Sequence, residues 1–287
     1  MKIRKAVITA AGWGTRFLPA TKAQSKEMLP LVDKPVIQYM VEEAAASGID
    51  QIIIVTALGR STIQDHFAPY LELEDVLKRK GNDDLLQKVR RVCELADICY
   101  IHQERQLGLG HAISITRELI GDEPFAVFLP DDIIESKVPV MAQMIKVYER
   151  YGSSVIAVEQ VGARDTRAYG IIEPRQVEDK VYQVLRLVEK PETGEAPSEL
   201  GIVGRYILTS QIFEMLDKTK SGEGGEIQLT DGLQLLLESQ NIYAYRFDGI
   251  RHDTGTPLGF LKASVDLALR RQDIGGEFRE YLRQLKL

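Results

Sequence analysis

The segment that most constrains this chain runs from Ala6 to Pro30. It begins with a short apolar run that ends at Ile8, which is typical of a fully buried strand. Two glycines follow, and glycine lets the backbone turn sharply and approach another molecule closely. Backbone N–H groups exposed by such a turn suit phosphate oxygens, and Arg16 and Lys26 add positive charge. The segment therefore predicts a cradle for nucleotide phosphates. Its predicted nucleotide-binding residues are Ala11, Gly12, Gly14 and Thr15.

Two common glycine loops do not fit this segment. A Walker loop needs four residues between its glycines and then Gly-Lys-Ser/Thr, whereas Gly12 and Gly14 are separated by one residue. A dinucleotide fingerprint needs Gly or Ala three places after its second glycine, where this chain has the bulky Phe17. The remaining alternative is an ordinary strand-to-loop turn. The adjoining Arg16 and the Lys26–Pro30 run favour the phosphate cradle over that alternative.

Composition narrows the class of protein. A chain of 287 residues suits one large domain or two small ones, and 44% apolar residues are enough for a sizeable core. The net charge of −6 argues against nonspecific binding to nucleic acid. The two cysteines, Cys93 and Cys99, fit a reducing cytoplasm better than a disulfide scaffold. Neither a signal peptide nor a membrane span is indicated, so we expect a cytoplasmic protein without a membrane or nucleic-acid partner.

Strand-like and helix-like segments alternate through the first half of the chain. Predicted strands cover 6–8, 52–56, 98–101 and 125–129, and predicted helices cover 36–47, 61–67, a charged surface pair within 71–95, and 108–119. Repeated strand–helix–strand units imply a mainly parallel sheet with helices on both faces. Ligands bind such sheets beyond the carboxyl ends of the strands.

The second half changes character. Predicted strands cover 154–161, 169–173, 180–189 and 201–208, and predicted helices cover 138–150 and 258–271. The short connections indicate a smaller antiparallel subregion, laid over the nucleotide part and suited to a second substrate. No linker is evident, so we expect one continuous domain with a nucleotide-binding part over about 1–135, a sugar-phosphate-binding part over about 136–256 and a C-terminal helical segment over about 257–287.

Several ordered motifs resemble those of the sugar-phosphate nucleotidylyltransferases. The opening segment is similar to the family pattern of strand, GxGTR and P-K-x-M-L-P, with Ser25 where proline is usual. Further matches lie at 107–112, 169–170, 188–191 (V-E-K-P), 202–206, 224–231 and 253–256, so the resemblance covers about residues 3–265. It implies an α/β fold with a mainly parallel, Rossmann-like mixed sheet flanked by helices and a smaller antiparallel sugar-binding subregion.

The resemblance also implies a reaction. UTP and glucose 1-phosphate would give UDP-glucose and pyrophosphate by in-line attack of the sugar phosphate on the α-phosphorus of UTP. Catalysis would rest on positioning and charge neutralisation, because a phosphate nucleophile is already ionised. The implied catalytic residues are Arg16 and Lys26, which hold the leaving phosphates, and Lys190, which delivers the sugar phosphate. The implied base-reading residues are Gln103 and Gly108, and the implied sugar-phosphate-binding residues are Gly170, Glu189, Lys190, Val203 and Gly204.

Some of these residues also have a simpler interpretation. Glu189 and Lys190 are neighbours at a predicted strand end, where a surface ion pair is the alternative. Neighbouring side chains on a strand point to opposite faces, so the two residues share a task only if the strand bends, which Pro191 makes plausible. The glycine turns at Gly170 and Gly204 have a structural turn as their alternative.

Two aspartates predict a metal site. Asp131 follows a buried strand, and Asp253 lies at a strand end before a glycine turn. Each alone is more typical of a helix cap or a turn, but the resemblance assigns both to a shared cation. Carboxylate oxygens suit Mg²⁺, which also accepts phosphate oxygens and water.

Two other functions stay open at this point. A thymidylyltransferase would use the same chemistry, and Asp253–Thr256 resembles the D-T-G-T of that relative as well. A catalytically silent nucleotide-sugar sensor on the same fold is the alternative from another class. The presence of Arg16, Lys26 and Asp131 favours an enzyme. We further expect a homo-oligomer, either a dimer or a tetramer.

Overall fold

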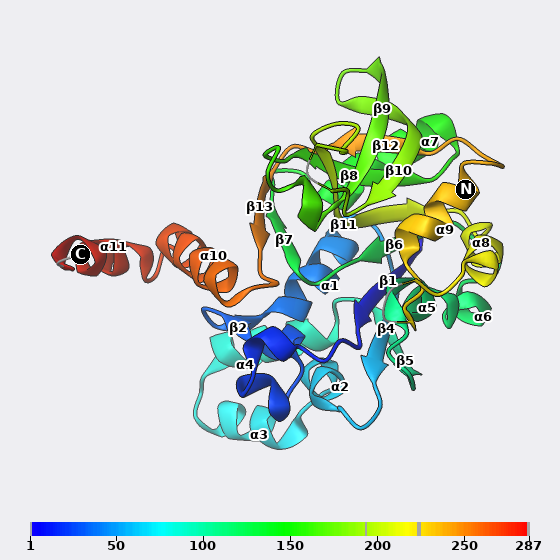
Figure 1. Cartoon of the computed structure of the whole chain (residues 1–287). Helices are drawn as coiled ribbons and strands as arrows, with labels where there is room; N and C mark the ends of the chain where they lie inside the picture. Colours follow the sequence, from blue (N-terminus) through cyan, green and yellow to red (C-terminus); the bar gives the residue numbers. More distant parts are fainter. Residues whose placement is uncertain (1, 193, 223–224, 286–287) are drawn as a thin grey trace.

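One mixed sheet runs through the protein in the order β5-β4-β1-β6-β11-β8-β12-β10-β9 (Figure 1). The computed structural model describes residues 2–192, 194–222 and 225–285. The strands of this sheet are β1 (Lys5–Ala10), β4 (Gln51–Ala57), β5 (Asp97–Gln103), β6 (Phe125–Phe128), β8 (Val155–Gln160), β9 (Gly170–Glu178), β10 (Val181–Glu189), β11 (Leu200–Leu208) and β12 (Tyr243–Arg246). Two small ribbons pair β2 (Pro30–Leu31) with β3 (Lys34–Pro35) and β7 (Asp132–Glu135) with β13 (Ile250–Asp253).

The first four strands of the sheet, β5, β4, β1 and β6, are all parallel. The residues of β1, β4 and β6 are mostly apolar and buried, as expected for strands that are covered by helices on each side, whereas the edge strand β5 is largely exposed or half-buried. Since parallel strands end at the same edge, the loops after β1, β5 and β6 meet there. This edge places the glycine loop, Gln103 and Asp131 near one another, and it confirms the predicted parallel α/β core.

The second half of the chain continues the same sheet. β11 runs antiparallel to both β6 and β8, β12 is parallel to β8, and the β9–β10 hairpin forms the far edge. The expectation that this subregion lies over the nucleotide part was therefore wrong. It is joined edge to edge through the β6–β11 ladder, where Tyr206 pairs with Val127.

Helices cover both faces of the sheet, and two more extend from the protein at its C-terminal end. They are α1 (Val36–Ala46), α2 (Thr62–Phe67), α3 (Leu71–Arg79), α4 (Asp83–Cys93), α5 (Gly108–Ser114), α6 (Arg117–Ile120), α7 (Val140–Tyr151), α8 (Ile212–Lys218), α9 (Leu229–Leu236), α10 (Pro257–Arg270) and α11 (Gly275–Gln284). The side chains of β1 alternate between two cores, with Ile8 facing α1 and α7 and Val7 facing α5, α8 and α9. In the second core the Phe125 and Phe213 rings stack with their centroids 5.3 Å apart.

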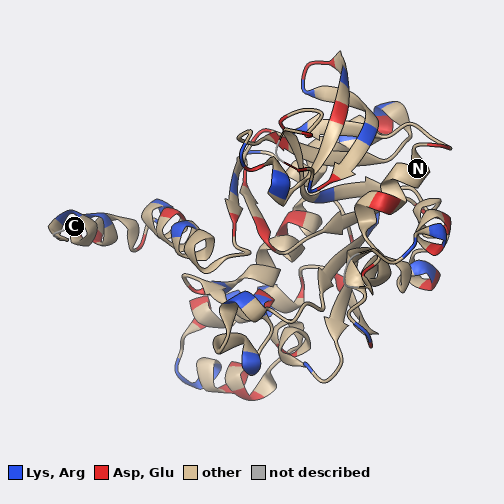
Figure 2. Ribbon diagram, in the orientation of Figure 1, with Lys and Arg blue, Asp and Glu red and all other residues tan. Residues whose placement is uncertain are grey.

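The helical regions depart from expectation at 108–119 and at α8 and α9, which were not predicted. The helix predicted over 108–119 is broken at Thr116, whose buried hydroxyl donates to the Ile113 carbonyl 2.7 Å away. The charged pair predicted within 71–95 is confirmed as α3 and α4, which are joined by an ion pair between Arg90 and Glu74. Figure 2 shows both kinds of charge along these two helices.

The C-terminal helices α10 and α11 extend away from the rest of the protein (Figure 1). The base of α10 is anchored beside the glycine loop, because the Phe17 and Phe260 rings meet edge to face at 5.7 Å. α11 packs mainly on α10. Within the described residues, no helix is both long enough and apolar enough to cross a membrane.

Candidate active site

A cavity of about 420 Å³ lies where the parallel strands end. Most residues predicted to hold the nucleotide line it together. They are Ala11, Gly12, Gly14, Thr15, Lys26, Gln103, Gly108 and Asp131, joined by Thr9, Trp13, Glu27, Gln106, Leu109, Ala112, Leu129, Pro130 and Glu226. The parallel register of β1, β5 and β6 thus gathers residues more than a hundred positions apart.

The glycine loop is shaped by its own contacts. Gly14 has φ of 64°, and a Cβ there would lie 3.1 Å from Thr21 Cγ2 and 3.3 Å from Lys26 Cβ. The Thr21 hydroxyl donates to the Gly14 carbonyl at 2.7 Å, which fixes this turn. Gly12 has open space where a side chain would be. Trp13, the single tryptophan of the chain, is 62% exposed at the mouth of the cavity and can serve as a fluorescence probe of binding.

Gln103, predicted to read the base, lines the cavity and is held by contacts within the chain. Its side-chain nitrogen donates to the Gly108 carbonyl at 3.2 Å and contacts His111 Nδ1 at 2.9 Å. Burial lowers the pKa of His111, which favours the neutral ring that can accept this hydrogen bond. In the part of the chain that the structure describes, the Gln103 carbonyl oxygen accepts no hydrogen bond, so it is available to an imide N–H.

The motif at 224–231 contacts the segment that is predicted to read the base. Gly224 lies outside the described residues, but Ile227 donates to the Leu107 carbonyl at 2.8 Å and accepts from the Gly110 N–H at 2.9 Å. A Cβ on Gly108, whose φ is 91°, would lie 2.9 Å from the Ile227 carbonyl oxygen. The glycine is therefore required by this close approach of two backbones.

Lys26 and Asp131 form an ion pair at the floor of the cavity. Burial lowers the pKa of Lys26, but the nearby charges of Asp131 and Glu27 raise it more, so the net shift is upward and the ammonium is kept charged. Arg16 is exposed and donates to the Gly255 carbonyl at 3.2 Å. The glycine loop is thereby linked to the C-terminal turn that follows Asp253.

The two predicted metal ligands lie side by side. A Cβ built on Gly255 would be 3.1 Å from Asp253 Oδ1 and 3.2 Å from Asp131 Oδ2, so both carboxylates flank one point. The Asp131 carbonyl accepts from the Thr254 N–H at 2.7 Å and from its hydroxyl at 2.9 Å. The β7–β13 ribbon, which sequence reasoning missed, makes this meeting possible because it pairs Asp253 with Asp132.

The predicted sugar-phosphate residues form a second group. β10 ends at Glu189, and Lys190 has φ of 43°, so the strand bends as the shared task requires. The Lys190 ammonium lies 3.5 Å from Glu189 Oε1 and is 59% exposed, which also satisfies the ion-pair alternative. Glu189 Oε2 accepts from the Thr230 hydroxyl at 2.7 Å and would lie 3.1 Å from a Cβ on Gly170.

Val203 and Gly204 lie deeper on β11. Val203 is buried in the core beneath α1 and α7. A Cβ on Gly204 would lie 2.7 Å from both Asp132 Oδ2 and Leu129 Cβ, and its N–H donates to Asp132 Oδ2 at 2.7 Å. Their contacts are packing contacts within the protein, and neither residue lines the 420 Å³ cavity. Their assignment to the sugar phosphate remains a prediction.

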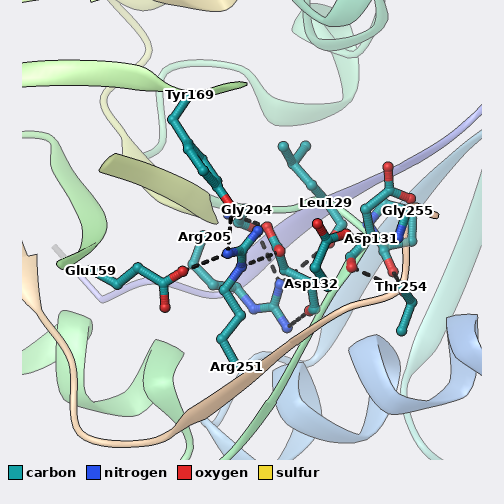
Figure 3. A network of polar contacts seen from close by, with 12 residues as sticks. Leu129, Asp131, Asp132, Glu159, Tyr169, Gly204, Arg205, Arg251, Thr254 and Gly255 are labelled. Atoms are coloured by element: carbon teal, nitrogen blue, oxygen red, sulfur yellow. Dashed lines mark hydrogen bonds and ion pairs between the residues drawn. The ribbon is translucent and has the colours of Figure 1, made fainter. Parts of the chain in front are cut away.

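Sequence reasoning missed two buried features. Both carboxylate oxygens of Glu27 lack a hydrogen-bond partner among the described residues, and burial raises the pKa of this group to about 7. Arg205 and Arg251 form the polar network of Figure 3. Arg205 is fully buried and pairs with Glu43 at 2.7 Å, while Arg251 contacts Asp132 and Glu159. Arg205 lies beside Gly204 in the sequence and Arg251 lies two residues before Asp253, which was the available signal for a role in the site. Their ion-pair partners could not be assigned from sequence.

Comparison with known proteins identifies the family. Residues 5–270 match the nucleotidyl transferase family. The chain belongs to this family of nucleotidyltransferases. A UTP–glucose-1-phosphate uridylyltransferase of Staphylococcus saprophyticus is 53% identical, and the match covers 100% of this chain and 99% of that protein.

Solved structures of similar proteins agree with this family assignment. A UTP-bound UGPase from Acinetobacter baumannii matches with a TM-score of 0.92 at 38% identity, over 99% of this chain and 100% of the other. A UDP-glucose pyrophosphorylase complexed with UDP-glucose matches with a TM-score of 0.85 at 42% identity, over 94% and 100% of the two chains. The predicted fold class and family are confirmed.

Proposed function

We propose that this nucleotidyltransferase joins UTP and glucose 1-phosphate to form UDP-glucose and pyrophosphate. The observation that carries the proposal is the cavity at the carboxyl ends of β1, β5 and β6, which unites the glycine loop, Gln103 and the Lys26–Asp131 pair. The full-length similarity to a UTP–glucose-1-phosphate uridylyltransferase supports the choice of both substrates.

The proposed reaction is an in-line displacement, as the family resemblance implies. An oxygen of the sugar phosphate forms a bond to the α-phosphorus of UTP, while the bond from that phosphorus to the bridging oxygen of pyrophosphate breaks. Lys190 offsets the repulsion between the two anionic substrates, and Arg16 and Lys26 neutralise the charge that collects on the leaving pyrophosphate. No side chain needs to remove a proton, so catalysis consists of positioning and electrostatic stabilisation.

The donor set fits a divalent cation, and we propose Mg²⁺. Mg²⁺ binds through one or two carboxylates plus substrate phosphates, which matches the Asp131 and Asp253 oxygens around Gly255. The described residues contain no cluster of three or more His, Cys, Asp or Glu that could hold a metal, so substrate oxygens and water would complete the coordination. Bound there, the cation would neutralise charge on the triphosphate. Asp131 would then exchange its contact with Lys26 for the cation, which frees Lys26 for phosphate.

A substrate panel tests the proposed function. Pyrophosphate release is measured for UTP, dTTP, ATP and CTP, each combined with several hexose 1-phosphates. We expect the largest kcat/KM for UTP with glucose 1-phosphate. A larger value for dTTP would assign the protein as a thymidylyltransferase. Tight binding of UTP, detected through Trp13 fluorescence, without any turnover would assign it as a sensor.

The organisation of the protein is also part of this proposal. We treat the chain as one domain, because a single sheet includes strands from both halves, and as cytoplasmic, because Cys93 and Cys99 are free thiols. We propose a homo-oligomer in which α10 and α11 pack on a second copy. These helices project from the protein and expose Leu258, Leu261 and Tyr281. Light scattering of the full chain tests this, and the mass of a single copy would contradict it.

A further inference from the structure

One guanidinium connects the two halves of the candidate site. Arg251 lies on β13, two residues before Asp253, and its side chain is only 10% exposed. It contacts the carboxylates of Asp132 and Glu159 and donates to the Tyr169 hydroxyl at 3.1 Å (Figure 3). The guanidinium also lies 5.2 Å from the centre of the Tyr169 ring. Three segments distant in sequence therefore meet at this side chain.

Two of these partners, Asp132 and Tyr169, adjoin residues assigned to the site. Asp132 follows Asp131 and accepts from the Gly204 N–H through its second oxygen. Tyr169 precedes Gly170, and its carbonyl accepts from the Lys190 N–H at 3.0 Å. Thus Arg251 is one contact away from a predicted metal ligand and one contact away from the residues predicted to hold the sugar phosphate.

The side chains of β13 point to two opposite sides, and this distinguishes the contacts of Arg251 from those that only anchor the strand. Residues two apart on a strand share a face, so Arg251 and Asp253 point the same way. His252 points to the opposite side, where it is buried and contacts Glu135 at 2.9 Å. β13 is anchored on that side by its histidine. On the side of the site, its position relative to Tyr169 depends on Arg251.

We propose that Arg251 is a positioning residue that sets the alignment between the Asp131–Asp253 pair and the sugar-phosphate side. This inference rests on the proposed function. A planar guanidinium can contact three acceptors at fixed angles, whereas an ammonium on a flexible stem cannot, so Arg→Lys is not conservative at such a site. A misplacement of about 1 Å between reacting groups can cost about 100-fold in rate. Arg251→Lys keeps the charge and should lose the alignment.

A binding measurement without metal tests the alignment directly. Trp13 fluorescence is titrated with UDP and with UDP-glucose in the presence of a chelator, for the wild type and Arg251→Lys. UDP reports the nucleotide side alone, and UDP-glucose reports both sides. We expect the Kd for UDP to change by less than about twofold, and the additional affinity that the glucosyl group contributes to fall by about tenfold.

Turnover is measured beside the binding. The kcat/KM of Arg251→Lys for glucose 1-phosphate should fall about 10- to 100-fold. Arg90→Lys is the matched control, because it changes an arginine that pairs with a buried carboxylate on α3, away from the site. Its kinetics should equal those of the wild type. A folded Arg251→Lys with wild-type kinetics, or with equal losses for UDP and UDP-glucose, would overturn the inference.

A second variant covers the case in which Arg251→Lys does not fold. Glu159→Gln keeps a hydrogen-bond acceptor for Arg251 and removes one charge, and Glu159 is not assigned to either substrate. It should show the same selective loss of glucosyl affinity at about two- to fivefold. Unchanged binding in folded Glu159→Gln would then reject the inference. A wild type that binds neither UDP nor UDP-glucose would instead reject the proposed function, so the two failures are distinguishable.

Discussion

The nucleotide side and the sugar-phosphate side of the candidate site are built differently. On the nucleotide side, four parallel strands end at one edge and leave a cavity of about 420 Å³. On the sugar-phosphate side, the strands are antiparallel, and Glu189 and Gly204 contact their own chain through Thr230 and Asp132. Gly170, Glu189 and Lys190 do not line this cavity.

The difference shows how the sheet distributes the two tasks. A parallel edge collects the ends of several strands, so a nucleotide cradle follows from the topology itself. The sugar-phosphate side depends on particular long-range contacts, such as those of Arg251 and Tyr169. We therefore expect variants on the two sides to separate nucleotide affinity from sugar-phosphate affinity. The carboxylates of Asp131 and Asp253, which we propose hold the cation, should affect the chemical step most.

The largest effect is expected at the metal carboxylates. Asp131→Asn and Asp253→Asn keep the shape of the side chain and remove one charge, and each should lower kcat by about 100-fold or more, as for a lost electrostatic stabiliser. The double variant should lose little more than either single variant, because both changes disable the same ion. kcat is measured across a magnesium titration, where high magnesium should restore part of the loss.

The control for this experiment is Asp217→Asn. Asp217 lies on α8, and the change removes the charge of an exposed carboxylate that pairs with Arg117. Circular dichroism confirms that every variant is folded. Folded Asp131→Asn and Asp253→Asn proteins with near-wild-type turnover at limiting magnesium would remove both aspartates from the active site. Strictly additive losses would place them in separate roles.

The next effect is expected at Lys190, on the sugar-phosphate side. Lys190→Ala should weaken the use of glucose 1-phosphate by about 10- to 150-fold, the usual value of a charged phosphate contact. Its UTP affinity should stay near that of the wild type, measured by calorimetry or Trp13 fluorescence. Lys180→Ala is the matched control, because Lys180 also has positive φ, of 62°, and also pairs with a carboxylate. An equal fall in UTP affinity would refute the separation of the two sides.

Much of the nucleotide side could be predicted from sequence, for a physical reason. Buried parallel strands are continuous apolar runs, and the polar residues that follow them, such as Gln103 and Asp131, must meet at one edge. The strands β7 and β12 were missed, and β13 was expected only as a strand end at Asp253, because each has four residues and no clear alternation of polarity. The order of the antiparallel strands could not be predicted either, because it depends on pairings between segments that are distant in sequence.

The remaining features of the site depend on distant partners. Glu27 follows Lys26 in the sequence, and this charged pair gives no indication of burial. The fold nevertheless removes the Glu27 carboxylate from water. Arg251 was visible as part of a C-terminal motif, but its contacts are 82 to 119 residues away in sequence. A side chain whose role is defined by such contacts cannot be assigned before the topology is known.

A smaller effect should separate UTP from dTTP on the nucleotide side. Both bases offer the same imide edge to Gln103, so only the 5-methyl group and the ribose 2′-hydroxyl discriminate between them. One methyl in a pocket is worth about 1–3 kcal/mol, so dTTP should retain measurable activity with a lower kcat/KM. Gln103→Leu should weaken both substrates and leave their ratio unchanged. A ratio that changes strongly in Gln103→Leu would show that this residue does not read the shared edge.

The smallest effect concerns stability at Glu27, a buried carboxylate on the nucleotide side. Burial raises the pKa of Glu27 to about 7 from an ordinary value near 4.5, so the folded protein holds a proton that the unfolded chain releases. The sign follows directly. The contribution to stability is complete below about pH 4.5, decreases as pH rises and is lost above about pH 7. Between pH 6 and pH 8 this amounts to about 1 kcal/mol of unfolding free energy.

Glu27→Gln should abolish that part of the pH dependence, because a neutral amide occupies the same buried space at every pH. The free energy of unfolding is measured by urea titration at pH 6 and pH 8 for the wild type, Glu27→Gln and Glu74→Gln. Glu74 is also buried, but it accepts from Arg90 at 2.7 Å. Since Glu27 is intact in that control, its pH dependence should match the wild type. If Glu27→Gln keeps the full wild-type difference between the two pH values, Glu27 is already ionised at pH 6. Its carboxylate would then have a compensating partner, and the burial of Glu27 would not distinguish the nucleotide side from the sugar-phosphate side.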